Sequence, residues 1–369
     1  MLRTLALLLI AANLAAQTPT SPELERLKRQ LQDAIRDKDL STAADIAAKL
    51  DDAVQRKFRA SLIHDASERV NDVLTWLPSD TETLLVYQEP FVIGAEDSPA
   101  IFYGRPARLY ATDRLMALNE GKLYRQLQGR TVRLLAAGLR NMRSRGVGVP
   151  SLMPEADVAY FYFFTEPLDP DLLGVPELSV EKQSLWRRTA KIDVNEPLKA
   201  GVRERSQRED ETWLALPRPD LLVAASSRDF QIEILGRIAR GPSTRALPSS
   251  LPEWAQVDRK ASFWGLRHYS HPEARHDNSN PRAKDSEAAQ SDAKALGATV
   301  QFDMDKNVVE VRYLSGGGHL PRFIESMVEH EFQVDQPQAD VWRLKSNLRN
   351  RGDFPFHFAA YLLGFGGYR

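Results

Sequence analysis

Apolar residues recur every three or four positions through residues 21–75, which is the spacing of one face of a helix. The first stripe consists of Leu24, Leu27, Leu31 and Ile35. The polar run "RDKDLS" follows, and its Ser41 can cap a second helix. Further stripes around Ile46–Val54 and Val70–Leu77 predict a helical hairpin followed by a third helix. A single pair of helices is not a repeat array, so a helical cap or stalk is favoured over a tetratricopeptide-like array.

After Pro78 the pattern changes to short runs of β-forming residues bounded by turn residues, as is typical of strands. We expect strands at 83–89, 100–104, 157–165, 187–194, 211–217, 221–226, 260–269, 297–304, 308–314 and 339–346. Helical spacing predicts helices at 112–128, 229–240 and 321–331. Residues 130–143 fit both a helix and a strand. The mixed order predicts an α+β fold: a mixed, largely antiparallel sheet or sheets with packed helices, preceded by an N-terminal helical hairpin.

These patterns divide the chain into three parts. Residues 1–16 form a signal peptide, 17–77 a helical cap or stalk, and 78–369 an α+β region. Two subdomains with a boundary near 166–210 are an alternative to one unit in the last part. The apolar C-terminus "FPFHFAAYLLGFGGYR" is too short for a membrane span, and burial is expected in preference to a docking tail.

The first residues have the layout of a secretory signal peptide. Arg3 is followed by the apolar run Thr4–Ala12 and by small residues that fit cleavage after Ala16. The run is shorter than the about 20 residues of a spanning helix, which favours cleavage over an uncleaved anchor. We therefore expect a secreted or periplasmic protein that is not transmembrane after cleavage.

Composition narrows the chemistry further. The 369-residue chain has no cysteine, which excludes disulfides, thiolate nucleophiles, cysteine-ligated zinc and iron–sulfur clusters. The net charge of −1 gives no general attraction to nucleic acid, and a hydrophobic content of 43% indicates a globular chain. No cofactor and no nucleic-acid partner is expected.

Several stretches together resemble a known group of sequences. They are "WLPSDTETLLVYQEPF", "LQGRTVRLLAAG", "RPDLLVAASSRDFQIEILGRI", "FWGLRHY", "DNSNP" and "VVEVRYLSG". In this order they resemble uncharacterised secreted bacterial proteins, found mainly in soil acidobacteria and planctomycete-like lineages, over residues 76–320. The resemblance implies a signal peptide and a strand at 131–137. It implies no activity, because none is established for the group.

The stretch "FWGLRHYSHPEARHDNSNP" at 263–281 gathers three of the seven histidines. Alternation along a strand places His268 with Trp264 and Leu266, and Arg267 on the opposite face with Phe263 and Tyr269. An extended chain points His271 away from His268, and no HExxH-type spacing occurs, so no metal site is expected. Residues 271–292 read as an exposed polar loop, as does "RERSQREDE" near 203–211. The candidate binding residues at this end are Arg267, His268, Tyr269, His276 and Asp277, with His319 from the run "YLSGGGHLPRF".

A second candidate is a basic stretch between Gly121 and Pro150 that contains no acidic residue. The proposed patch consists of Lys122, Arg125, Arg130, Arg133 and Arg140. It would suit an anionic envelope component or an acidic surface of another protein. The alternative is that acidic residues from elsewhere in the chain fold against it.

Catalytic signatures are missing from the sequence. There is no GxSxG elbow and no phosphate-loop pattern, and Ser179–Lys182 matches SxxK without its partner motifs. We therefore predict a non-enzymatic binding or scaffolding module of the cell envelope. The alternative is an enzyme of unfamiliar type with a site near the 267–277 strand end and loop.

Overall fold

The computed structural model describes most of the chain. The described residues are 22–36, 39–93, 122–143, 155–197, 203–241, 244–268, 295–303, 308–315, 332–347 and 362–363. They fall into two compact units that meet between Arg69 and Val70. Outside the described residues lie the predicted signal peptide, the predicted strand at 100–104 and helix at 321–331, and the part of the 112–128 helix before residue 122.

The predicted helical hairpin is made by α2 (Pro22–Arg36) and α3 (Leu40–Trp76), and the first unit contains α2 and the part of α3 up to Arg69. The two helices bury a shared apolar cluster: Leu27, Leu31, Ala34, Ala43, Ile46, Leu50 and Ala53. The cap of α3 is Asp39 and not Ser41, because the Thr42 amide donates to Asp39 Oδ1 at 3.0 Å. The Thr42 hydroxyl also donates to Asp39, and this bond, followed by the one from the amide, lowers the pKa of Asp39.

The prediction of a third, separate helix was wrong. Residues 40–76 form one continuous helix. No glycine or proline occurs in this span, so nothing in the backbone chemistry stops the helix between the two apolar stripes. In the described residues, no helix combines the length and apolar character needed to cross a membrane.

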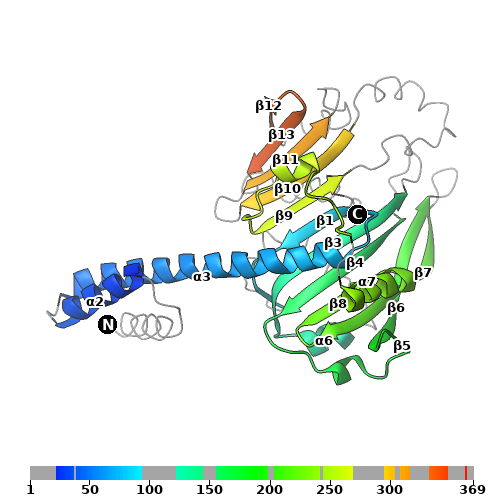
Figure 1. The fold of residues 1–369 in the computed structure, drawn as a ribbon, viewed down its shortest axis with the longest axis horizontal. Coiled ribbons are helices and arrows are strands. Elements are labelled where there is room, and N and C mark those ends of the chain that lie inside the picture. The colour runs from blue at the N-terminus through cyan, green and yellow to red at the C-terminus, as the bar shows by residue number, and fades with distance from the viewer. Residues whose placement is uncertain are drawn as a thin grey trace. The chain divides into compact units, whose positions relative to one another are not determined.

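The second unit is built on one large antiparallel sheet, which confirms the α+β class (Figure 1). Its described strands are β1 (Thr81–Tyr87), β2 (Phe91–Val92), β3 (Thr131–Arg143), β4 (Glu155–Phe164), β5 (Leu178–Val180), β6 (Gln183–Pro197), β7 (Arg203–Arg218), β8 (Leu221–Ala225), β9 (Phe263–His268), β10 (Ala295–Asp303), β11 (Val308–Ser315), β12 (Gln333–Gln338) and β13 (Val341–Asn347). The order is β12-β13-β11-β10-β9-β1-β3-β4-β8-β7-β6-β5, and β2 pairs with β3. The helical elements of this unit are α6 (Lys122–Leu127), α7 (Arg228–Arg240), and the short 3-10 turns η2 (Pro170–Leu173) and η3 (Pro252–Ala255).

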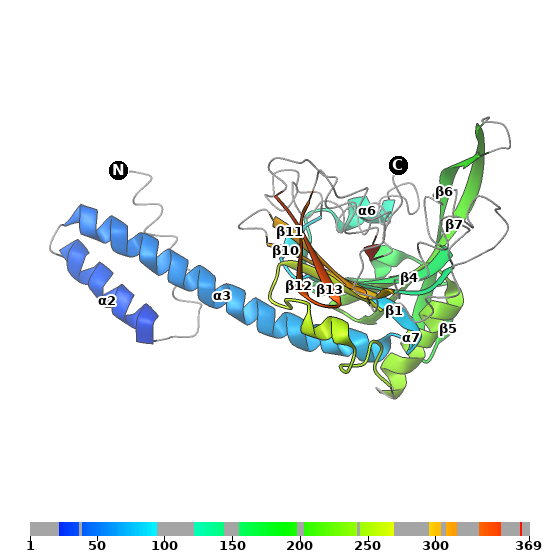
Figure 2. The same ribbon diagram turned by 90° about the horizontal axis from the view of Figure 1, so that it is seen from above.

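Two segments of the sheet differ from the sequence expectations or settle them. The ambiguous residues 130–143 form strand β3. The run "RERSQREDE", expected as a loop, is the first half of β7 and pairs with β6 up to Pro197↔Arg203. Figure 2 shows β6 and β7 extending past the other strands as a two-stranded ribbon. Such a ribbon pairs its own backbone groups and needs no apolar face, so a purely polar sequence can form it.

Both faces of the sheet are buried at its centre. Along β1, Leu85 and Tyr87 lie on one side, here called the Leu85 face, and Leu84 and Val86 lie on the Leu84 face. The Leu85 face belongs to the main core cluster, which includes Leu362 and Leu363 near the C-terminus. Burial of these two leucines confirms the expectation for the part of the C-terminal segment that is described.

The Leu84 face is covered by the end of α3, by α7 and by the chain between α7 and β9. Trp76 packs on Phe161 and Phe163 of β4, with ring centroids 6.2 and 6.4 Å apart. Leu77 fills the space above Gly138, where a Cβ would lie 2.5 Å from a leucine methyl carbon. A side chain at position 138 would therefore displace the end of the helix from the sheet.

Candidate functional site

Residues 244–262, here called the connecting segment, run from α7 to β9 and carry η3. The Trp254 ring packs edge-on against Trp264 of β9, with centroids 6.1 Å apart at 65°. Its indole Nε1 donates to the carbonyl of Leu247 at 3.1 Å. Leu247 is buried with a φ of 49°, a left-handed conformation that is strained for a leucine. The segment thus holds one indole rigidly against the sheet.

The residue beside this indole, Glu253, forms a pair with His268 at the end of β9. Glu253 Oε1 lies 2.9 Å from His268 Nδ1. The Glu253 side chain is completely buried, whereas the His268 side chain is 31% exposed. The second carboxylate oxygen, Oε2, is buried and has no hydrogen-bond partner among the described residues. A carboxylate on Nδ1 fixes the ring orientation and leaves Nε2 as the outward group, the arrangement used by histidine bases and metal ligands.

Gly297 of β10 makes room for this pair. A Cβ at that position would overlap Glu253 Oε1 and lie 2.5 Å from the Arg267 carbonyl oxygen. Only glycine therefore lets the buried carboxylate lie against the strand backbone.

Of the predicted strand-end residues, the structure describes Arg267 and His268, and it does not bring their side chains together. Arg267 lies on the Leu85 face, as strand alternation predicts, and its Nη1 donates to the Leu362 carbonyl at 3.2 Å. It is 5% exposed, so it anchors the C-terminal segment inside the core. Tyr269, His276, Asp277 and His319 lie outside the described residues. No group of three or more metal-ligating side chains occurs in the part of the chain that the structure describes.

Glu253, the partner of His268, was missed at the sequence level. It lies fifteen positions before His268, in a 3-10 turn, and no motif connects the two residues. The only signal in that stretch is Pro252, which marks the start of a helical turn. The pairing follows from how the connecting segment folds onto the sheet.

The predicted basic patch is partly neutralised by the fold. Arg133 Nη2 pairs with Asp220 at 2.7 Å. Arg140 contacts three carboxylates, on Asp80, Asp157 and Glu233, at 3.7, 3.1 and 2.6 Å. Acidic residues from elsewhere therefore fold against Arg133 and Arg140, as the alternative for this stretch expects.

Arg140 sits at the centre of a structural cluster. Its guanidinium also stacks on Phe230 of α7, 4.3 Å from the ring centroid. Burial lowers the pKa of Arg140, but the hydrogen bonds to Glu233 and Asp157 outweigh it and the net pKa is raised. Arg140 thus ties β3 to β4 and α7.

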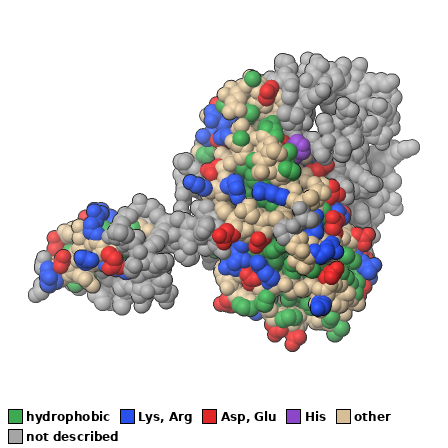
Figure 3. All heavy atoms as spheres, in the orientation of Figure 1, with side chains coloured by type: hydrophobic (Ala, Val, Ile, Leu, Met, Phe, Trp, Pro, Cys, Tyr) green, Lys and Arg blue, Asp and Glu red, His purple; other side chains and the backbone are tan. Residues whose placement is uncertain are grey.

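The structure describes the side chains of two further members of the patch, Arg125 and Arg130. Arg125 on α6 is exposed, and Arg130 Nη1 donates to the Pro167 carbonyl at 3.5 Å. Lys122 begins α6. Figure 3 shows cationic and anionic side chains interspersed over the visible face of the second unit. A patch at Lys122, Arg125 and Arg130 stays a prediction.

The Leu84 face becomes polar beyond β9. One cross-strand row changes from Leu84 and Leu266 to Thr299, Arg312 and Arg343. The next row changes from Val86 and Trp264 to Gln301, Glu310 and Lys345. We call these six residues of β10, β11 and β13 the polar rows: Thr299, Gln301, Glu310, Arg312, Arg343 and Lys345.

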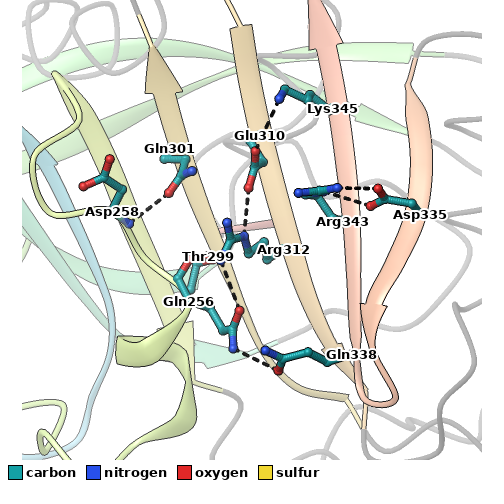
Figure 4. A network of polar contacts seen from close by, with 10 residues as sticks. All are labelled: Gln256, Asp258, Thr299, Gln301, Glu310, Arg312, Asp335, Gln338, Arg343 and Lys345. Atoms are coloured by element: carbon teal, nitrogen blue, oxygen red, sulfur yellow. Dashed lines mark hydrogen bonds and ion pairs between the residues drawn. The ribbon is translucent and has the colours of Figure 1, made fainter.

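Hydrogen bonds order the polar rows (Figure 4). Arg312 Nε donates to Glu310 Oε1 at 2.8 Å, and its Nη1 donates to Gln256 Oε1 at 3.2 Å. The Asp258 amide donates to Gln301 Oε1 at 2.9 Å. The connecting segment therefore fixes one side of this polar surface.

On the other side of the polar rows, Arg343 of β13 makes two contacts with Asp335 of the edge strand β12, one of them 2.9 Å from Nε to Oδ1. The Arg343 bond and charge are the main reason that the pKa of Asp335 is lowered.

No protein-family model and no curated protein sequence matches this chain. Among solved structures, crystal form I of TP0453 matches with a TM-score of 0.37 and 9% identity, over 74% of this chain and 91% of that chain. Crystal form III gives 0.36 and 7% over 75% and 96%, and form IV gives 0.33 and 10% over 75% and 94%. At TM-scores this low, the similarity carries no argument about function.

Proposed function

We propose that this chain is a secreted or periplasmic, non-enzymatic binding module of the cell envelope, and that it binds through the polar rows. The supporting observation is the change along the Leu84 face. From β4 to β9 this face packs against α3, α7 and the connecting segment, whereas two of its cross-strand rows over β10, β11 and β13 are polar. The localisation rests on the sequence of residues 1–16 alone.

The chemistry of the polar rows suits a polar polymer. Amide, hydroxyl, guanidinium, ammonium and carboxylate groups lie over three strands. The three cations of the rows stand against one carboxylate within them, Glu310, and a second beside them on β12, Asp335. Such donors and acceptors can bind hydroxyl, amide and carboxylate groups of a ligand. Because these side chains already hold one another in place, little rotamer freedom is lost on binding. We therefore take the glycan-and-peptide polymer of the bacterial cell wall as the partner.

Co-sedimentation of the full chain with purified, insoluble cell-wall peptidoglycan tests this proposal. The double variant Gln301→Ala/Arg312→Ala removes one group from each polar row, and we expect it to lower the bound fraction at least severalfold. The matched control Arg29→Ala/Gln30→Ala changes two exposed side chains of α2 and should bind like the wild type. A wild-type protein that stays in the supernatant, or a double variant that sediments unchanged, would reject the proposal.

An enzyme is the second candidate, because Glu253 holds His268 with Nε2 directed away from the carboxylate. In that case wild-type protein would turn over an activated ester such as p-nitrophenyl acetate with saturation kinetics, and both His268→Gln and Glu253→Gln would lose this activity. Rates no higher than those of free imidazole at equal concentration would reject the enzyme.

A further inference from the structure

Two arginines of the connecting segment contact the same indole ring, that of Trp254. The guanidinium carbons of Arg245 and Arg259 lie 5.2 and 5.7 Å from the centroid of the Trp254 ring. Both side chains are half-buried. Stacking on an indole favours each cation, but it supplies no hydrogen-bond acceptor in the plane of the guanidinium.

Neither arginine is neutralised by a carboxylate of the described residues. The Nε of Arg245 is buried and has no hydrogen-bond partner in that part of the chain. Burial lowers the pKa of Arg245, and the positive charge of Arg259 lowers it further. The segment's own acids are engaged elsewhere, Glu253 Oε1 with His268 and Asp258 Oδ1 with the Lys260 amide.

The backbone that carries both arginines is fixed. The Gln88 side-chain amide donates to the carbonyls of Arg259 and Ala261 at 3.0 and 2.6 Å. Next to Arg245 in the chain, the Ala246 amide donates to the Leu74 carbonyl at 2.8 Å. The strained Leu247 accepts the Trp254 indole bond. Two like charges are thus held near each other, although repulsion favours their separation.

We propose that Arg245 and Arg259 bind one oxyanion of a ligand, a phosphate or a carboxylate, beside the Trp254 indole. The guanidinium group matches the geometry of such an anion, since two parallel N–H groups can reach two of its oxygens. An anion that accepts hydrogen bonds from the terminal Nη groups would remove the repulsion between the two cations. This site uses none of the polar rows and does not depend on the peptidoglycan proposal.

Isothermal titration of the full chain with inorganic phosphate and, separately, with citrate tests the site at constant ionic strength. We expect saturable binding of at least one of these anions, and the tighter one identifies the class of ligand. Arg245→Gln and Arg259→Gln should each weaken binding about tenfold or more, because each removes a charge-assisted pair of hydrogen bonds. The control Arg240→Gln alters an exposed arginine of α7 and should bind like the wild type.

Arg259→Lys keeps the charge but loses the planar guanidinium group, so it should still weaken binding severalfold. It replaces the glutamine variant in the titration if that variant does not fold. Wild-type protein that binds neither anion, or variants at both arginines that bind as tightly as wild type, would overturn the proposal. The titration uses phosphate and citrate as probes, and the co-sedimentation assay uses the cell-wall polymer. If no anion binds, the co-sedimentation result is unaffected. If the protein does not sediment with the polymer, the titration result is unaffected.

Discussion

Arg140 and Arg245 both place a guanidinium over an aromatic ring, yet their charges are handled in opposite ways. Arg140 over Phe230 contacts three carboxylates, and its net pKa is raised. Arg245 over Trp254 has a second cation as its charged neighbour, and its pKa is lowered by burial first and then by that cation. Ring stacking is common to both, so it does not distinguish a structural arginine from a binding one. The two differ in whether carboxylates of the same chain neutralise the guanidinium.

The two regions also differ in what they connect. The Arg140 cluster joins β3, β4, α7 and the turn before β1, so its ion pairs are part of the fold. The connecting segment is held by its indole and by the Glu253–His268 pair, and its two arginines contribute no ion pair among the described residues. We expect the two regions to respond differently to substitution.

The largest loss of stability is expected from a substitution at Gly297. The connecting segment packs against this residue, whereas the Arg140 cluster does not. Gly297→Ala should lower the free energy of unfolding by about 3 kcal/mol, because its methyl group would collide with the Glu253 carboxylate and the Arg267 carbonyl. Urea unfolding followed by circular dichroism measures this. In the control Gly236→Ala, the nearest atom is the movable end of Arg240, so stability should hold or rise.

The next effect is expected at Arg140 itself. Arg140→Met keeps the aliphatic contact but leaves three carboxylates without their cation, and should cost about 2 kcal/mol. This loss of stability is smaller than that expected for a fully buried ion pair, because Asp80 and Glu233 are partly exposed. Arg125→Met on exposed α6 should change stability by less than about 0.5 kcal/mol. Equal losses at the two positions would mean that the ion pairs of Arg140 contribute little.

The corresponding changes in the connecting segment should be nearly neutral. Without added anion, Arg245→Gln loses a ring contact worth about 0.5–1 kcal/mol and also relieves the repulsion from Arg259. We therefore expect a net change within about 0.5 kcal/mol in the same urea assay. A loss as large as that of Arg140→Met would show that Arg245 is structural, and the comparison would fail.

The smallest effect is a pH dependence at the edge of the sheet. Arg343 holds the pKa of Asp335 below its usual value, so the pair stabilises the fold above the unfolded pKa of Asp335, and this is lost as pH falls through the lower folded value. Asp335→Asn should thus be slightly less stable than wild type at pH 7 and equal to it in strong acid. Unfolding curves at both pH values check this; an equal gap at both would contradict it.

Patterns along the sequence predicted the fold class and most strands, since alternation and turn residues are local signals. They failed where the local signal was missing. The polar first half of β7 has no apolar face, and β12 carries Pro337 with every residue exposed. The boundary predicted inside α3 came from a weak apolar stripe, although no residue there can end a helix.

The candidate sites were less predictable, because they depend on contacts between distant parts of the chain. Seven cations and no acid between Gly121 and Pro150 suggested a basic patch. The carboxylates of Asp220 and Glu233, which pair with two of these cations, lie far along the sequence and gave no local signal. Arg245 and Arg259 are fourteen positions apart in a stretch without periodicity, and only the fold brings them to one indole. Strand alternation did correctly separate Arg267 from His268.

The most direct test of this account is the thermal midpoint of the full chain in phosphate and in chloride at equal ionic strength. An anion that binds only the folded state raises the midpoint as its concentration rises. We predict that phosphate, or citrate in its place, raises the midpoint of the wild type and of Arg240→Gln but not that of Arg245→Gln/Arg259→Gln. An equal rise in the double variant, or no rise in the wild type with either anion, would contradict the claim that these two arginines are left to bind an anion.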